Sequence, residues 1–163
     1  DTTAMKTEEL QEYLTSRFGA VDKKREMQIT LFSFGFKYGI PIDADMVIDV
    51  RFLKNPFYVE KYKHWTGRVT EVGRYISDSP VTKEFLEKLY DFMDFTVNHF
   101  RDAGKTQFTI AIGCTGGMHR SVFVTETLGV HLKEQHAHVN VEHRDLHRNR
   151  IEKDVDDQTE ENR

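Results

Sequence analysis

The sequence predicts an α/β fold in which helices flank a small, mainly parallel sheet, because apolar stretches of strand length alternate with stretches of helical periodicity. Its 163 residues are enough for one domain with a hydrophobic core. A glycine-rich segment, GCTGGMHRS (residues 113–121), joins one of these strands to a helix. That order of strand, glycine-rich loop and helix predicts an anion-binding site.

The individual elements are predicted from spacing and from turn residues. Residues 81–103 keep helical spacing behind Pro80, which suits the first turn of a helix, and a second helix runs from the glycine-rich loop to the neighbourhood of Lys133. Residues 35–41 contain two glycines and a proline and are predicted to be irregular, and residues 58–79 to form short helices and loops. Strands are predicted at residues 27–34, 46–50, 107–112 and 139–143, and an amphipathic helix at 7–18.

Composition and charge narrow the classes of function. Hydrophobic residues make up 38% and charged residues 31% of the chain, as in an ordinary soluble protein. No apolar run is long enough to span a bilayer and no signal peptide is visible, so no membrane partner is expected. A single cysteine allows no internal disulfide and fits a reducing cytoplasm. The net charge of −4 argues against a surface that binds nucleic acid throughout.

The glycine-rich loop is the main candidate site, because ligands of open α/β sheets bind at the carboxyl ends of the strands. Two glycines allow the backbone to approach an anion, two hydroxyls and a histidine can donate hydrogen bonds, and an arginine can grip a phosphate with two prongs. A tight turn without a ligand is the alternative interpretation. The candidate residues are Thr115, Gly116, Gly117, His119, Arg120 and Ser121.

Cys114 admits two interpretations. The spacing C-x5-R-S matches the phosphate loop of protein tyrosine phosphatases and rhodaneses, in which a thiolate is the nucleophile. However, Gly113 stands where the phosphatases usually have histidine, and no mobile loop offers an obvious general acid, although Asp43, Asp45 or Asp49 could be proposed. A lone cysteine at the end of a strand is more often a small buried hydrophobe.

The C-terminal region contains a basic segment followed by an acidic one. Arg144, Arg148 and Arg150 form a short basic run of the kind that contacts RNA phosphates, with a frayed, charged terminus as the alternative. Residues 151–163 are acidic and nearly free of apolar side chains, which predicts a disordered tail. Four histidines lack the spacing of a metal site, so a solvated face and no bound metal are expected for His136, His138, His143 and His147.

Several long motifs carry a resemblance to a known family. SFGFKYG (residues 33–39), DADMVIDVRFLKNP (43–56), AIGCTGGMHRSV (111–122) and HRDLHR (143–148) closely resemble the C-terminal domain of the RapZ/YvcJ family of nucleotide-binding proteins and RNase adapters. Residues 1–18 look like the segment that joins this domain to an N-terminal P-loop domain. The resemblance therefore implies a linker helix at 1–26, a ligand-sensing domain at 27–150, and a missing half that binds and hydrolyses ATP or GTP.

The resemblance also implies a ligand and an output. In the best-known members of this family, the domain binds small regulatory RNAs and senses glucosamine-6-phosphate. The resemblance therefore implies a non-catalytic sensor of a phosphorylated amino sugar or a related anion, with RNA or a regulatory protein as its output and with self-association. The implied ligand residues, with Arg51 and Asn55 nearby, are Cys114, Thr115, Gly116, Gly117, His119 and Arg120. Two departures alter the rim of the pocket: Phe57 stands where relatives have histidine or tyrosine, and YKHWTG (62–67) replaces LRPxTG. This chain itself has no P-loop motif and no expected cofactor.

Overall fold

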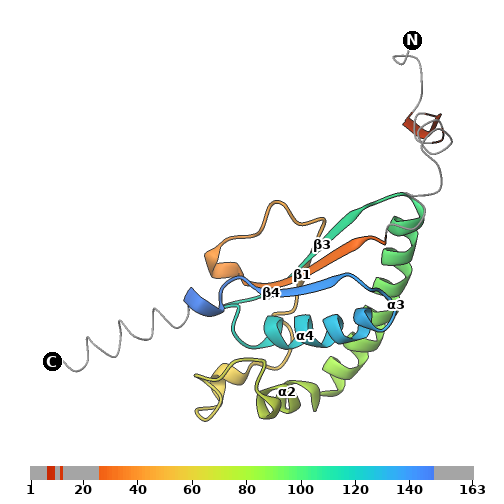
Figure 1. Ribbon diagram of the computed structural model, residues 1–163. Helices are drawn as coiled ribbons and strands as arrows, with labels where there is room; N and C mark the ends of the chain where they lie inside the picture. The colour runs from red at the N-terminus through yellow and green to blue at the C-terminus, as the bar shows by residue number, and fades with distance from the viewer. Residues whose placement is uncertain (1–6, 10–11, 13–25, 149–163) are drawn as a thin grey trace.

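Four parallel strands form one sheet, in the order β2-β3-β1-β4. The computed structural model describes residues 7–9, 12 and 26–148 (Figure 1). The predicted α/β class is confirmed, and every strand pairing in the described sheet is parallel. The strands are β1 (Gln28–Gly35), β2 (Met46–Asp49), β3 (Gln107–Cys114) and β4 (Val139–His143).

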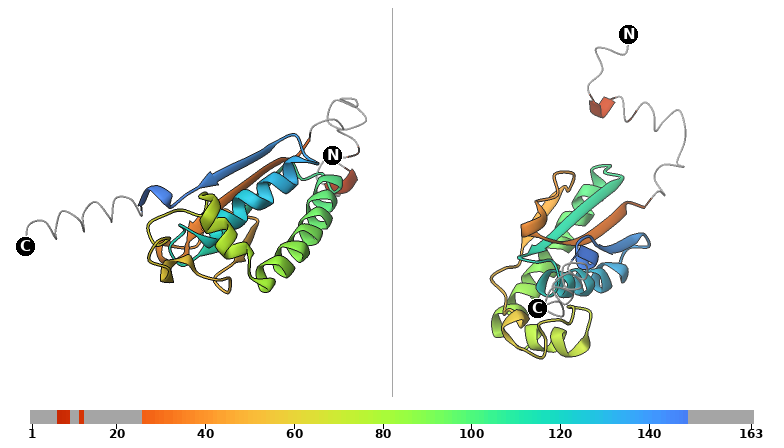
Figure 2. Two further views of the ribbon diagram at one scale, coloured as in Figure 1. Left: turned by 90° about the horizontal axis from the view of Figure 1, so that it is seen from below. Right: turned by 90° about the vertical axis from the view of Figure 1, so that its left-hand side faces the viewer.

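The three α-helices of residues 26–148 lie on one face of this sheet (Figure 2). They are α2 (Thr70–Ser77), α3 (Pro80–Asp102) and α4 (Arg120–Lys133). Side chains alternate along a strand, so every second residue of the sheet faces these helices. The face toward the helices is apolar and buried in the central strands, for example at Leu31 and Ile110, whereas Asn140 and Glu142 on the other face are exposed. The fold is therefore a two-layer α/β arrangement.

One hydrophobic core holds the two layers together. The two central strands supply Ile29, Leu31, Phe108, Ile110 and Ile112, and α4 supplies Val124, Leu128 and Leu132. Helix α3 adds Leu89, Met93 and Val97 from its buried stripe. Burial of this apolar surface is the main force that fixes the layers, because exposed strands and helices of this length are marginal alone. Within the described residues, no helix combines the length and apolar content needed to cross a bilayer.

The predicted elements agree with the structure to within one or two residues, with one error. The sequence predicts an irregular segment at 35–41, but Phe36–Tyr38 forms a 3-10 helix, η3. The N–H of Gly39 closes this turn by donating to the carbonyl of Phe36. A single turn tolerates the flanking glycines because Gly39 adopts a φ of 96° there. A second short 3-10 helix, η4, spans Pro56–Tyr58. The remainder of the predicted 7–18 helix and the 151–163 tail lie outside the described residues.

The carboxyl ends of all four strands meet at one edge of the sheet. Gly35 of β1 lies beside Cys114 of β3, Ser33 of β1 beside His143 of β4, and Asp49 of β2 beside Gly113. This is the edge at which ligands bind in open parallel sheets. The sheet topology therefore brings the glycine-rich loop together with the segments that follow β1, β2 and β4.

Candidate anion-binding site

The glycine-rich loop leads from the end of β3 directly into α4. The helix begins at Arg120, with His119 as its N-cap, and no side chain of a described residue caps it. The first N–H groups of a helix have no partner within the helix, and the helix dipole adds partial positive charge at that end. The N-terminus of this 14-residue helix therefore presents donors and positive potential at the carboxyl edge of the sheet.

Arg120 is a buried arginine whose charge is not matched by a nearby carboxylate. Its side chain is 5% exposed, and no carboxylate oxygen of a described residue lies within 4.0 Å of its guanidinium nitrogens. Nη1 donates to the backbone carbonyls of Arg51 and Leu53, and Nη2 lies 3.4 Å from Thr115 Oγ1. Nε is buried without a hydrogen-bond partner. The edge formed by Nε and Nη2, which grips phosphates and carboxylates in bidentate pairs, is thus the less satisfied edge.

His119 is buried and connects the start of α4 to the segment that contains Tyr62. It is 6% exposed, and Nε2 lies 3.1 Å from the carbonyl oxygen of Tyr62. A carbonyl only accepts, so Nε2 carries a proton and donates. Burial lowers the pKa of His119, and the positive charge of Arg120 lowers it further, while the carbonyl of Tyr62 opposes this. His119 is consequently neutral at pH 7 and ties the 62–67 segment to the start of α4, whereas the sequence suggested a donor that titrates near neutrality.

A close backbone contact requires glycine at Gly117 of the loop and at Gly35 of β1. Gly117 has a φ of 73°, which side chains rarely tolerate, and a Cβ there would lie 2.6 Å from the nitrogen of Gly35. A Cβ on Gly35 would in turn lie 2.5 Å from the carbonyl carbon of Gly116. The N–H of Lys37 donates to the Thr115 carbonyl at 3.2 Å, so the segment after β1 packs on the loop. Thr115 itself is exposed.

Cys114 is buried beneath the loop. It is 3% exposed, and Sγ lies 3.0 Å from the hydroxyl oxygen of Ser121, which is completely buried. Three carboxylates were considered as general acids. Asp45 accepts from the N–H of Thr109 and pairs with Lys105, Asp49 pairs with Arg51, and Asp43 is exposed. A nucleophilic thiolate needs access to its substrate. The arrangement matches the interpretation of Cys114 as a small buried side chain.

Arg51 contacts Arg120 through its backbone carbonyl, and Asn55 follows two residues after Leu53, whose carbonyl is also a partner of Arg120. The side chains of Arg51 and Asn55 have partners of their own. Arg51 forms a bidentate pair with Asp49, with Nη2 at 2.7 Å from Oδ2, and its guanidinium lies 4.0 Å from the centre of the Phe36 ring. The hydrogen bond from Arg51 lowers the pKa of Asp49, and Arg120 adds a smaller electrostatic effect. The side-chain oxygen of Asn55 accepts from the N–H of Phe57 and caps η4. Contact with a ligand would require Arg51 to leave Asp49.

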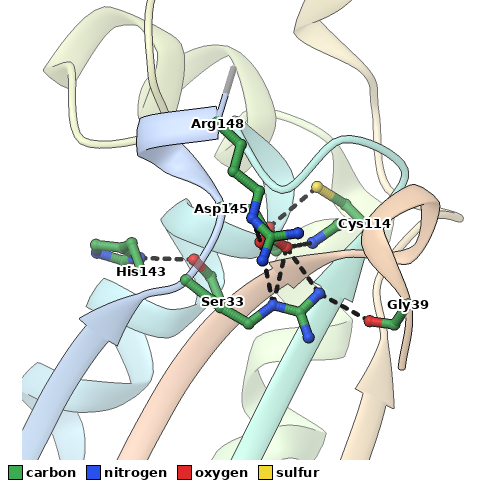
Figure 3. A network of polar contacts seen from close by, with 9 residues as sticks. Ser33, Gly39, Cys114, His143, Asp145 and Arg148 are labelled. Atoms are coloured by element: carbon green, nitrogen blue, oxygen red, sulfur yellow. Dashed lines mark hydrogen bonds and ion pairs between the residues drawn. The ribbon is translucent and has the colours of Figure 1, made fainter. Parts of the chain in front are cut away.

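The basic segment is partly tied to the same edge of the sheet by Asp145. This carboxylate is completely buried and forms ion pairs with Arg144 at 2.9 Å and Arg148 at 3.5 Å (Figure 3). Arg144 also donates to the carbonyl of Gly39, and its side chain is 28% exposed, against 52% for Arg148. Arg148 is therefore the more accessible of the two. Arg150 lies outside the described residues.

His143 is part of a buried polar chain, so the predicted solvated face is wrong for this residue. Its side chain is 8% exposed, with Nδ1 2.7 Å from Ser33 Oγ and Nε2 2.7 Å from Glu126 Oε1. Glu126 also pairs with Arg68 at 3.4 Å. The order of serine, histidine and glutamate resembles a hydrolase triad, but Ser33 is completely buried against the helical layer and cannot reach a substrate.

A cavity of about 400 Å³ lies beside the loop, between α2 and α4. It is lined by residues 67–70 and by Gly73, Arg74, Ser77, Phe123 and Glu126. None of the predicted ligand residues lines it. The cavity is nevertheless adjacent, because the N–H of Gly67 donates to the carbonyl of Met118 in the loop.

Two residues that shape the site were not predicted as functional. Gly35 carries no chemical group, and only the close contact across the sheet edge reveals its role. Asp145 had a weak signal in the sequence, because it is the single acidic residue between Arg144 and Arg148. Asp145 and Arg148 are three positions apart, a spacing that places two side chains on one face of a helical turn. Burial, which the sequence does not report, distinguishes such a carboxylate from a surface one.

Comparison with known proteins places the chain in a family. Residues 27–147 match the family described as the RapZ C-terminal domain. A nucleotide-binding protein of Caldicellulosiruptor saccharolyticus is 48% identical over 95% of this chain and 51% of its own length. Nucleotide-binding proteins of Desulforamulus reducens and Bacillus thuringiensis are 46% and 49% identical over 91% and 90% of this chain, and over 50% and 49% of their own lengths. The chain spans about half the length of these relatives. On these matches, the chain belongs to the RapZ C-terminal domain family.

Proposed function

We propose that this domain senses a phosphorylated amino sugar such as glucosamine-6-phosphate, or a related anion, at the loop of residues 113–121, and does not convert it. The observation that carries the proposal is Arg120, a buried guanidinium without a carboxylate partner among the described residues. A buried charge is costly unless it is paired. A bound phosphate would supply the missing negative charge at the place where the protein leaves it uncompensated.

The surroundings of Arg120 suit a phosphate better than a carboxylate of the protein. The uncapped N-terminus of α4 offers backbone N–H groups, and the glycines at 116 and 117 bring the loop backbone close without side chains in the way. The Nε and Nη2 edge of Arg120 adds a planar pair of donors. Three kinds of donor therefore lie within the loop and the start of α4, and together they suit a phosphate, which offers several acceptor oxygens.

The identity of the sugar comes from the family rather than from the geometry. Glucosamine-6-phosphate is what the resemblance implies. Arg51, which contacts Arg120, and Asn55, four residues further along the chain, are the candidates for contacts with the sugar. Phe57 is half exposed next to Asn55 and replaces the polar side chain common in relatives. This replacement therefore favours a changed preference for the sugar of the ligand, while the contact with its phosphate is kept.

The remaining parts of the proposal concern the longer protein. Relatives of about twice this length are named nucleotide-binding proteins, which supports a second domain that binds a nucleotide. We propose ATP or GTP as this nucleotide, with hydrolytic activity, because the family resemblance implies both. The basic residues Arg144, Arg148 and Arg150 support RNA as the output, with a regulatory protein as the alternative. We propose that the whole protein acts in the cytoplasm as a homo-oligomer.

A phosphatase that uses Cys114 is the second candidate, favoured by the C-x5-R-S spacing. Its weakness is access. Sγ is buried and directed at Ser121, and each of Asp45 and Asp49 already has a cationic partner. Non-catalytic binding needs neither an exposed thiolate nor a general acid, so the sensor accounts for more of the site.

A ligand panel tests the proposal. Melting temperature and calorimetric affinity are measured with glucosamine-6-phosphate, glucosamine, inorganic phosphate and ATP. A ligand that binds only the native state at 100 times its Kd adds about 2.7 kcal/mol to the free energy of unfolding. We expect saturable stabilisation by glucosamine-6-phosphate, a weaker effect of inorganic phosphate and none of glucosamine. Equal effects of glucosamine and glucosamine-6-phosphate would contradict a phosphate site.

A further inference from the structure

The buried carboxylate of Asp145 forms a hydrogen bond with the last residue of β1, Gly35. Oδ2 accepts a hydrogen bond from the N–H of Gly35 at 2.7 Å, and the same carboxylate receives Nε and Nη2 of Arg144 at 3.1 and 2.9 Å (Figure 3). Arg148 approaches the other oxygen at 3.5 Å. Two arginines and a backbone N–H compensate the burial of the charge, which would otherwise be strongly unfavourable.

Gly35 is also the residue against which the glycine-rich loop packs. A Cβ on Gly35 would lie 2.5 Å from the carbonyl carbon of Gly116, and a Cβ on Gly117 would lie 2.6 Å from the nitrogen of Gly35. The backbone at the end of β1 is therefore in direct contact with the backbone of the loop. The peptide nitrogen of Gly35 therefore lies between the Asp145 carboxylate on one side and the loop on the other. A shift of Gly35 cannot be absorbed by a flexible side chain, because only backbone atoms meet there.

We propose that Asp145 is a positioning residue for the anion-binding loop. It does not touch the anion. By fixing the N–H of Gly35, it sets where Gly116 and Gly117 lie, and with them the backbone donors ahead of Arg120. The inference rests on the proposed function of the loop, and it adds a direct connection between that loop and the basic segment, since Arg144 and Arg148 share the same carboxylate.

The pairing of Asp145 with two arginines prevents its carboxylate from repelling the bound anion. A lone carboxylate behind an anion site would repel the anion and weaken binding. Here the two guanidinium groups within 3.5 Å more than balance the single negative charge. The Asp145 cluster is therefore net positive, and its hydrogen bond to Gly35 is available for positioning without an electrostatic penalty for the bound phosphate.

Two substitutions separate the hydrogen bond from the charge. Asp145→Asn keeps an oxygen that can accept from Gly35 and loses the charge, whereas Asp145→Ala loses both. We expect glucosamine-6-phosphate to bind Asp145→Asn within about threefold of wild type and Asp145→Ala at least about tenfold more weakly, as for the loss of one well-placed hydrogen bond. Asp94→Ala is the matched control, because Asp94 is a partly buried carboxylate paired with His131 away from the loop.

A measurement without ligand makes the result independent of the proposed function. In the full chain, the backbone amide resonances of Gly116 and Gly117 are compared among wild type, Asp145→Asn, Asp145→Ala and Asp94→Ala. We expect these two resonances to move in Asp145→Ala, to move little in Asp145→Asn and to stay in place in Asp94→Ala. If wild type binds no phosphate compound, the proposed function fails while the resonances still decide whether Asp145 positions the loop.

Gly35→Ala provides the second route if Asp145→Ala does not fold. The added methyl group would press on Gly116 from the same place, so it should move the same two resonances and weaken binding of glucosamine-6-phosphate. Unmoved Gly116 and Gly117 resonances in Asp145→Ala or Gly35→Ala would overturn the proposal. So would affinity as weak in Asp145→Asn as in Asp145→Ala, since the charge and not the hydrogen bond would then matter.

Discussion

Arg120, the first residue of α4, donates a hydrogen bond to the backbone carbonyl of Arg51 in the turn that follows β2. The contact joins the helix N-terminus to a segment 69 positions earlier in the chain. Because Nη1 is used in this way, the orientation of the guanidinium is fixed before any anion arrives. A fixed orientation reduces the entropy that binding must overcome, which is a general advantage of preorganised sites.

Arg120 should therefore dominate the affinity for phosphate. Replacement by Ala removes a charge-assisted pair of roughly 1.5–3 kcal/mol, so glucosamine-6-phosphate should bind roughly 10- to 100-fold more weakly by calorimetry. Arg120→Lys keeps the charge and loses the planar fork, and an intermediate affinity is expected. Affinities are compared well below each melting temperature, because Arg120→Ala also leaves the carbonyls of Arg51 and Leu53 without a donor.

The exposed Arg74 supplies the control for this series. It is an arginine on α2 that lines the neighbouring cavity, and Arg74→Ala changes the net charge by the same amount as Arg120→Ala. Wild-type affinity is expected for Arg74→Ala. Equal affinities of wild type and Arg120→Ala would place the anion elsewhere.

His119 should make the domain less stable in weak acid. Burial lowers its pKa below the ordinary value of 6.5, so the unfolded chain takes up a proton at a higher pH than the folded one. This contribution to stability is complete above the unfolded pKa and is lost as the pH falls through 6.5 toward the folded pKa. The urea midpoint should drop more between about pH 7.5 and about pH 5.5 in wild type than in His119→Gln. His64→Gln, at an exposed position, should behave as wild type.

Cys114→Ser should preserve binding of glucosamine-6-phosphate. Serine has nearly the same shape and can still hydrogen-bond to Ser121, so only a modest loss of stability is expected from the added polarity at a buried site. Wild type should release no phosphate from aryl or sugar phosphates above the buffer rate. Steady phosphate release by wild type that disappears in Cys114→Ser would contradict the sensor and support a phosphatase, because a hydroxyl is a far poorer nucleophile than a thiolate.

RNA binding, if it uses the basic segment, should depend on Arg148 more than on Arg144. Arg148 is the more exposed, and each lost phosphate contact lowers the slope of affinity against salt by about 0.7 for single-stranded RNA. Arg148→Ala should flatten this slope with little change in melting temperature. Arg144→Ala should lower the melting temperature, because it leaves Asp145 and the Gly39 carbonyl with one partner fewer. A gel shift without retardation at low salt would exclude RNA as the output.

The periodicity of the sequence determined most of the fold. The strands, the long helix behind Pro80 and the helix after the glycine-rich loop are predicted nearly to their ends, because the apolar spacing of each shows in a short stretch of sequence. The short turn at Phe36–Tyr38 was missed because a single 3-10 turn has no period to detect. The loop itself was recognised from its glycines and from the helix that follows.

Tertiary structure decided how the residues of that loop are used. The sequence indicated Arg120 and His119 as polar groups for a ligand, but only the fold turns Nη1 toward Arg51 and buries His119 against Tyr62. It also converts Gly35 and Asp145, which are 110 residues apart, into neighbours behind the loop. The physical reason is that burial and long-range contact depend on which strands lie side by side, and the order β2-β3-β1-β4 is not encoded in any local pattern.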